Sequence, residues 1–254
     1  METKSPVPSP SLPQPGESAQ GMMEDIWFDR VMVPALVSAC LGMAATMEWM
    51  NIAFKTSPWF WTVLFCLSVA FTAWRYKSMR LEIGRRQQGI RGERIVGQLL
   101  EDLRSLGCKV YHDVVEDGYN IDHVIIGPHG VFAVETKALS KPRRGQSIVR
   151  FDGETVTVGG YQPDRDPVVQ ANASARRIRH ILRERTGQEP RVTPVLLYVG
   201  WFVETYARDT SVIVMNQDYF YKSFDRLQDC NTLSADQVDF FAAGMELYLR
   251  DKRK

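Results

Sequence analysis

Residues Asn120 to Lys137 read NIDHVIIGPHGVFAVETK. Two apolar runs flank the sequence Gly-Pro-His-Gly at positions 127–130, which is typical of two β-strands joined by a tight turn. Three charged residues interrupt the apolar pattern: Asp122 in the first strand, and Glu135 and Lys137 in the second. Charged side chains are rarely buried without a partner, so these three are the first candidates for a functional site.

The spacing of the three charges indicates that they lie near one another. Side chains two positions apart on a strand face the same way, so Glu135 and Lys137 share a face. If the strands pair around the turn, Asp122 lies close to both. Two carboxylates and one ammonium suit a Mg²⁺ site in which Asp122 and Glu135 bind the metal and Lys137 positions water. Ordinary ion pairing among these residues explains the same spacing, and spacing alone leaves both interpretations open.

Two residues outside this stretch join the candidate site. Glu93 lies at the edge of the apolar stripe of a helix predicted over 93–106, about 100° from its centre, and from there it can face the sheet. Gln170 lies in the first turn of another predicted helix, on the side of its apolar residues. A glutamine near a helix start is suited to bind a phosphate or a metal-ligating carboxylate.

The elements around the stretch indicate an α/β domain with a mixed sheet covered by helices on both faces. Strands are predicted at 109–115, 192–199 and 211–215, and Asp152-Gly153 predicts a two-residue hairpin between 147–151 and 154–158. Asp166-Pro167 predicts a helix start, with the helix ending near Gly187. Ser234 with Gln237 predicts a capping box that opens a last helix.

The first 90 residues have a different composition. Residues 1–28 are expected to form a disordered tail, because their Pro- and Ser-rich start buries too little apolar surface to offset the entropy of ordering. Two runs without charge follow, 17 residues at 31–47 and 19 residues at 56–74. A bilayer core takes about 17–25 apolar residues per helix, so we expect two transmembrane helices joined near 51–57. A pair of buried core helices is the alternative.

The flanking charges predict an orientation. The loop offers only Lys55, whereas residues 75–91 carry six cations and one acid. The positive-inside rule places this basic segment in the cytoplasm, and a hairpin brings the N-terminus to the same side. The segment also suits anionic lipid or nucleic acid, although a topology signal alone explains it.

Composition excludes several classes of site. The four cysteines lie far apart with no Cys-x-x-Cys or Cys/His spacing, which argues against a zinc site or a disulfide framework. We read His112, His123 and His129 as surface or turn residues. No Gly-rich phosphate loop or Gly-x-Ser-x-Gly elbow occurs.

Three segments together resemble a known family: Gly92-Glu93-Arg94, then residues 120–137, then Pro167 to Gln170. They are similar to the nuclease-related domain (NERD) family of the PD-(D/E)xK nuclease-like superfamily, and the resemblance covers roughly residues 90–200. It implies a restriction-endonuclease-like α/β core and a Mg²⁺- or Mn²⁺-dependent phosphodiesterase site. The resemblance implies that Asp122 and Glu135 are metal ligands and that Lys137 orients water or stabilises charge. It also implies that Glu93 and Gln170 complete the set of catalytic residues.

We therefore expect a membrane-anchored enzyme that hydrolyses nucleic acid, with DNA expected before RNA, in an inner or plasma membrane. Its parts are a tail (1–28), a transmembrane hairpin (29–76), a basic juxtamembrane linker (77–91) and a nuclease-like domain (92–254, core 92–200), with both termini and the domain cytoplasmic. The alternative is a non-catalytic module that binds nucleic acid or protein at the membrane. The sequence leaves open the oligomeric state and the mode of cleavage.

Overall fold

The computed structural model describes most of the chain, which separates into two units. One unit comprises residues 1–17 with 88–254, and the other comprises 18–87. The described residues are 14–15, 27–52, 56–116, 119–141, 147–207, 210–227 and 232–252. Most of the predicted tail therefore lies outside them, as does the Asp117-Gly118 pair that follows the first strand.

The described residues of the unit 18–87 are mostly helical. A π-helical turn, η1 (Phe28–Met32), leads into α2 (Val33–Trp49), and α3 (Pro58–Glu101) begins after the loop that was predicted near 51–57. The 22 residues Phe28–Trp49 are long and apolar enough to cross a membrane. Within the described residues no second helix meets that criterion, although two spans were expected. One such helix is weak evidence, since a core helix or a signal sequence meets the same test.

Helix α3 is continuous over 44 residues, from Pro58 to Glu101. It includes residues 77–91, which the sequence analysis treats as a linker, and it passes the division between the units at Gln87 and Gln88. The physical reason for its continuity is composition: residues 77–91 hold four Arg and two Gln, which are good helix formers, and no proline. The helix ends in the 3₁₀ turn η2 (Asp102–Leu106), and Gly107 follows in the left-handed region at φ 82°.

The domain is built on a five-stranded mixed sheet in the order β1-β2-β3-β6-β8. The first three strands are antiparallel neighbours, whereas β6 runs parallel to both β3 and β8. The strands are β1 (Lys109–Glu116), β2 (Tyr119–Gly127), β3 (Gly130–Lys137), β6 (Val192–Tyr198) and β8 (Ile213–Asn216). The predicted mixed α/β fold is confirmed in this unit.

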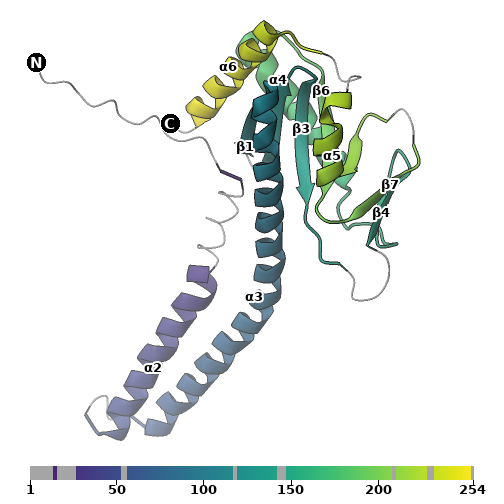
Figure 1. The fold of residues 1–254 in the computed structure, drawn as a ribbon. Helices are drawn as coiled ribbons and strands as arrows, with labels where there is room; N and C mark the ends of the chain where they lie inside the picture. The colour runs from purple at the N-terminus through teal and green to yellow at the C-terminus, as the bar shows by residue number, and fades with distance from the viewer. Residues whose placement is uncertain are drawn as a thin grey trace, which may run out of the picture. The chain divides into compact units, whose positions relative to one another are not determined.

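Helices cover both faces of the sheet (Figure 1). Helices α4 (Pro167–Thr186) and α6 (Ala235–Lys252) pack on one face through residues such as Ile178 and Met245. The end of α3 and the pair α5 (Gln217–Ser223) and η3 (Phe224–Arg226) pack on the other, where Phe132 of β3 contacts Phe220 and Phe224. Apolar side chains on both faces of β2 and β3 therefore lie in two separate cores.

A smaller sheet, in the order β5-β4-β7, lies beside the main one (Figure 1). It pairs β4 (Ile148–Phe151) with β5 (Val156–Val158) and with β7 (Phe202–Thr205), a strand that the sequence analysis missed. The predicted two-residue turn at Asp152-Gly153 is wrong. The carboxylate of Asp152 accepts the N–H groups of Glu154 and Thr155, which makes the loop four residues long, 152–155.

The predicted helix starts are confirmed. The Asp166 carboxylate accepts the backbone N–H of Val168 at 2.8 Å, with Pro167 at the first helical position of α4. At the start of α6, Ser234 and Gln237 exchange side-chain and backbone hydrogen bonds as a capping box. These caps fix where α4 and α6 begin on the sheet.

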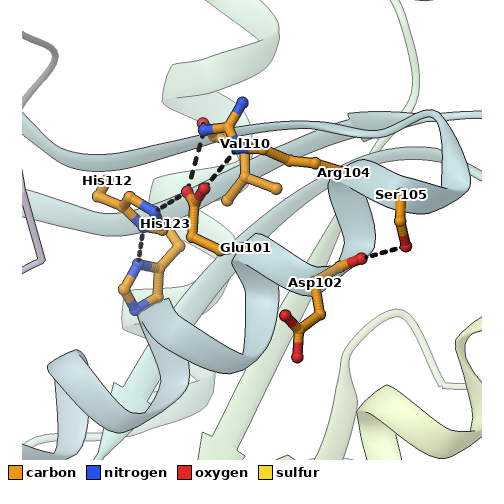
Figure 2. Close-up of polar contacts among 7 residues, drawn as sticks. All are labelled: Glu101, Asp102, Arg104, Ser105, Val110, His112 and His123. Atoms are coloured by element: carbon orange, nitrogen blue, oxygen red, sulfur yellow. Dashed lines mark hydrogen bonds and ion pairs between the residues drawn. The ribbon is translucent and has the colours of Figure 1, made fainter.

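The interpretation of His112 and His123 as surface or turn residues is wrong. They are opposite each other in β1 and β2, with 6% and 0% of their surface exposed. Figure 2 shows the chain of polar contacts that they form: Glu101 of α3 lies 2.7 Å from His112 Nε2, and the Nδ1 atoms of the two histidines lie 2.8 Å apart. Sequence periodicity could not separate these residues from exposed ones, because their burial depends on α3 covering them. His129 does lie in the turn.

Candidate active site

The register of β2 and β3 places the candidate acids together. Residue numbers of paired positions sum to 257, from Gly127 opposite Gly130 to His123 opposite Val134. One step further, the same register sets Asp122 opposite Glu135. Lys137 is the last residue of β3, and it pairs with Tyr198 at the end of the parallel neighbour β6.

Asp122 lies where the backbone pairing of β2 with β3 ends. Its Oδ2 accepts the backbone N–H of Thr136 at 2.7 Å, so the carboxylate holds the next part of β3 in place. Among the described residues, its Oδ1 takes no hydrogen bond. Burial raises the pKa of Asp122 well above its ordinary value, and the nearby carboxylates of Glu135 and Glu93 raise it further. The Thr136 N–H and the Lys137 ammonium oppose that rise without cancelling it.

Lys137 joins β3 to the start of α4. Its Nζ donates to Glu135 Oε1 at 2.8 Å and to Gln170 Oε1 at 2.9 Å. The Lys137 and Glu135 side chains are 22% and 13% exposed, so solvent screens this ion pair only in part. Gln170 reaches the lysine because the Asp166 cap starts α4 four residues earlier. The start of α4 thus determines where the side-chain amide of Gln170 lies.

Glu93 approaches the same group of charges from α3. Burial raises the pKa of the half-buried Glu93, and the carboxylates of Asp113 and Glu135 add to the rise, while Lys137 opposes it. Gly92 brings the helix close to the sheet, since a Cβ at that position would lie 2.2 Å from the Cβ of Ala138. The missing side chain at Gly92 therefore lets Glu93 approach the end of β3.

Asp113 is an acid beside this group that sequence reasoning missed. It lies in β1 with 5% of its surface exposed and a positive φ of 49°, which is uncommon outside glycine. Asn120 Nδ2 donates to its Oδ1 at 3.2 Å. In β1 and β2 the paired numbers sum to 235, which sets Asp113 opposite Asp122. The positive φ of Asp113 is the feature that marks this residue as unusual, and the amino-acid sequence of a strand does not reveal it.

The structure thus brings together all five residues that the sequence nominated. Contacts and electrostatic effects link Glu93, Asp122, Glu135, Lys137 and Gln170, which come from α3, β2, β3 and α4. In the described part of the chain, no three His, Cys, Asp or Glu side chains form a group that could hold a metal ion. The arrangement still fits a hard cation, because Mg²⁺ is usually held by one or two carboxylates with water and substrate phosphate.

One of three comparisons with known proteins gives a match. The search of curated proteins and that of solved structures each returned no match. A family model described as "Nuclease-related domain" matches residues 88–199, which is under half of the chain and covers α3 from Gln88, β1 to β6 and α4. The mixed sheet flanked by helices is consistent with a nuclease-like domain. The match therefore supports the NERD family for residues 88–199, and with it a nuclease-like fold.

Proposed function

We propose that this protein is a membrane-anchored nuclease that hydrolyses phosphodiester bonds of nucleic acid at the site formed by Glu93, Asp122, Glu135, Lys137 and Gln170. The observation that carries the proposal is the position of Lys137, whose Nζ contacts both Glu135 and Gln170 near the half-buried Asp122. The family match to residues 88–199 supports the same chemistry, because it is a match to a nuclease-related domain.

Asp122 and Glu135 are the residues that would hold a Mg²⁺ or Mn²⁺ ion. The Glu135 and Glu93 carboxylates add to the rise that burial causes in the pKa of Asp122, and a cation between Asp122 and Glu135 would relieve this repulsion. When bound, the ion lowers the pKa of coordinated water and neutralises charge on the phosphate. Thr136 fixes one oxygen of Asp122, which directs the other away from that hydrogen bond.

Lys137 and Gln170 would orient the reactants. An ammonium held at 2.8 Å from Glu135 is placed to donate to an attacking water or to a phosphate oxygen in the transition state. Gln170 restricts the rotation of that ammonium through its Oε1. Glu93 adds negative charge that favours the cation, as its proximity to Glu135 indicates. DNA is the first substrate to test, and RNA the second.

The test is a nuclease assay on the full chain in detergent with Mg²⁺ or Mn²⁺, using single- and double-stranded DNA and RNA. We expect cleavage by the wild type and its loss in Glu135→Ala and Lys137→Ala. Glu154→Ala, an exposed change in the 152–155 loop, is the matched control and should cleave normally. Equal cleavage by all four proteins would refute the proposed site.

A non-catalytic module that binds nucleic acid or protein is the second candidate. The Lys137–Glu135 ion pair and the lack of a three-ligand group among the described residues favour it. Metal titration separates the two functions. A nuclease of this design should gain thermal stability from Mn²⁺ in a way that Asp122→Asn abolishes, whereas a module whose acids serve only folding should gain none.

We also propose that two spans, Phe28–Trp49 and the apolar start of α3, anchor the chain in a membrane with both termini in the cytoplasm. Trp59, Trp61 and Trp74 lower the hydropathy of the second run, but Trp is enriched at membrane interfaces, where the ends of a span lie. Gln14 and Pro15 belong to the same unit as the domain. These two residues can contact the domain only if they lie on the same side of the membrane as the domain. An even number of spans between them and the domain meets this condition.

Epitope tags at the two termini test this topology. Two spans predict that both tags resist protease added outside intact cells and become sensitive once the membrane is opened. Opposite behaviour of the two tags would indicate a single span, and release of the chain into the soluble fraction would exclude an anchor.

A further inference from the structure

Gly97 lies in the interior of α3, where glycine is unfavourable compared with alanine. Its backbone is helical, so the conformation does not require glycine. Packing supplies the reason, because a Cβ at Gly97 would lie 2.3 Å from Cγ and 2.9 Å from Cβ of Pro15. The missing side chain at Gly97 therefore makes room for a proline that lies 82 positions earlier in the chain (97 − 15 = 82).

The surface around this contact is hollowed. A cavity of about 390 Å³ is lined by Arg94, Gly97, Gln98 and Glu101 of α3 and by His112 of β1, with Gln14 and Pro15 as its other wall. Arg94, Gln98, Glu101 and His112 place polar groups around the hollow, although most of its lining surface is apolar.

We propose that the face of α3 around Gly97, which borders this hollow together with Pro15 and which we call the Gly97 groove, is a docking site for a proline-containing segment, and that its occupant is the N-terminal segment of the same chain around Pro15. The sequence Pro13-Gln14-Pro15 fits this role. Proline fixes its own φ and restricts the residue before it to extended conformations, so such a segment loses little entropy when it docks.

Docking has a consequence for the buried histidines. A Cβ at Gly97 would lie 3.6 Å from His112 Cε1, and His112 and Pro15 line the same hollow. With Pro15 in place, His112 is 6% exposed, and it connects Glu101 to His123. The docked segment thus shields one end of the polar chain in Figure 2 from solvent.

Photo-crosslinking in the full chain tests the docking. A benzophenone side chain in place of the exposed Gln98 is activated by light in detergent-solubilised protein, and crosslinked peptides are mapped by mass spectrometry. We expect crosslinks to a peptide that contains Pro15. Gly97→Ala should lower their yield at least fivefold, because its methyl group occupies the space of the Pro15 ring. Gly89→Ala on the same helix is the matched control and should leave the yield unchanged, since a Cβ there meets nothing within 4 Å.

Two further measurements guard against misfolding and against contacts between molecules. Gly97→Ala should melt no lower than the wild type, because alanine favours the helix, and an added peptide of residues 9–18 should compete with the crosslink in the wild-type background. Equal yields from Gly97→Ala and Gly89→Ala, or failure of the peptide to compete, would overturn the proposal. Crosslinks that join isotopically labelled to unlabelled chains would overturn the assignment of the occupant to the same chain.

Discussion

Replacing Gly92 with alanine tests how closely α3 must approach β3 for the candidate site to form. A Cβ at position 92 would lie 2.2 Å from the Cβ of Ala138 and 3.4 Å from its Cα. Carbon atoms in contact lie about 3.5–4.0 Å apart, so the helix must retreat by roughly 1.3–1.8 Å or the end of β3 must move. Either movement separates Glu93 from Glu135 and Lys137.

The magnitude follows from two opposing terms. Overpacking of this kind costs about 1–3 kcal/mol. The better helix propensity of alanine stabilises the folded protein by about 1 kcal/mol. Gly89→Ala gains the same propensity without the overpacking, because a Cβ at Gly89 meets nothing within 4 Å. The two variants should therefore differ by about 1–3 kcal/mol, or roughly 2–12 °C in Tm for a domain of this size.

The assay compares Tm and, if the nuclease proposal holds, the rate of cleavage in wild type, Gly92→Ala and Gly89→Ala. A displacement of about 1 Å in an active site can lower activity on the order of 100-fold, so Gly92→Ala should lose activity while Gly89→Ala keeps it. Identical Tm and activity in the two variants would refute the reasoning, since it would mean that α3 tolerates a larger distance from β3.

Three other changes test the charges. Burial and the acids nearby raise the pKa of Asp122, so its ionised form destabilises the folded protein. The Tm of the wild type should therefore fall as pH rises from about 4 toward this raised pKa. The Asp122→Asn variant should show a flatter dependence of Tm on pH, and a higher Tm than the wild type at pH 7.5 without divalent ions. Lys137→Met should lower cleavage by about 10²–10³-fold while substrate binding persists, as measured by single-turnover kinetics. Tyr248→Phe removes the hydroxyl that donates to the buried Glu116, and it should cost about 1–3 kcal/mol in thermal melts with cleavage unchanged.

Much of the site could be predicted because its signals are local. The run 120–137 contains a turn, two apolar strands and three charges, and the register of an antiparallel pair follows from the turn. The start of α4 likewise follows from Asp166-Pro167, which fixes Gln170 in its first turn. Local chemistry of this kind places a residue without knowledge of the rest of the fold.

Features that depend on distant packing could not be predicted. His112 and His123 are buried because α3 covers them, and their sequence neighbours look the same as those of exposed histidines. Asp113 combines a buried acid with a positive φ in the middle of a strand, and strand periodicity contains no sign of either. The strand β7 exists because β4 offers it an edge, far away in the sequence.

The balance of charge argues that the acids serve more than folding. Lys137 contributes one positive charge, and its ammonium is already paired with Glu135. Burial raises the pKa values of Asp122 and Glu93 most, the neighbouring carboxylates raise them further, and the Lys137 ammonium does not cancel this combined effect. A site needed only for stability would gain from replacing such an acid with a neutral residue. A further cation beside Asp122 would favour its ionised form, and the metal ion of the proposed nuclease would supply that charge.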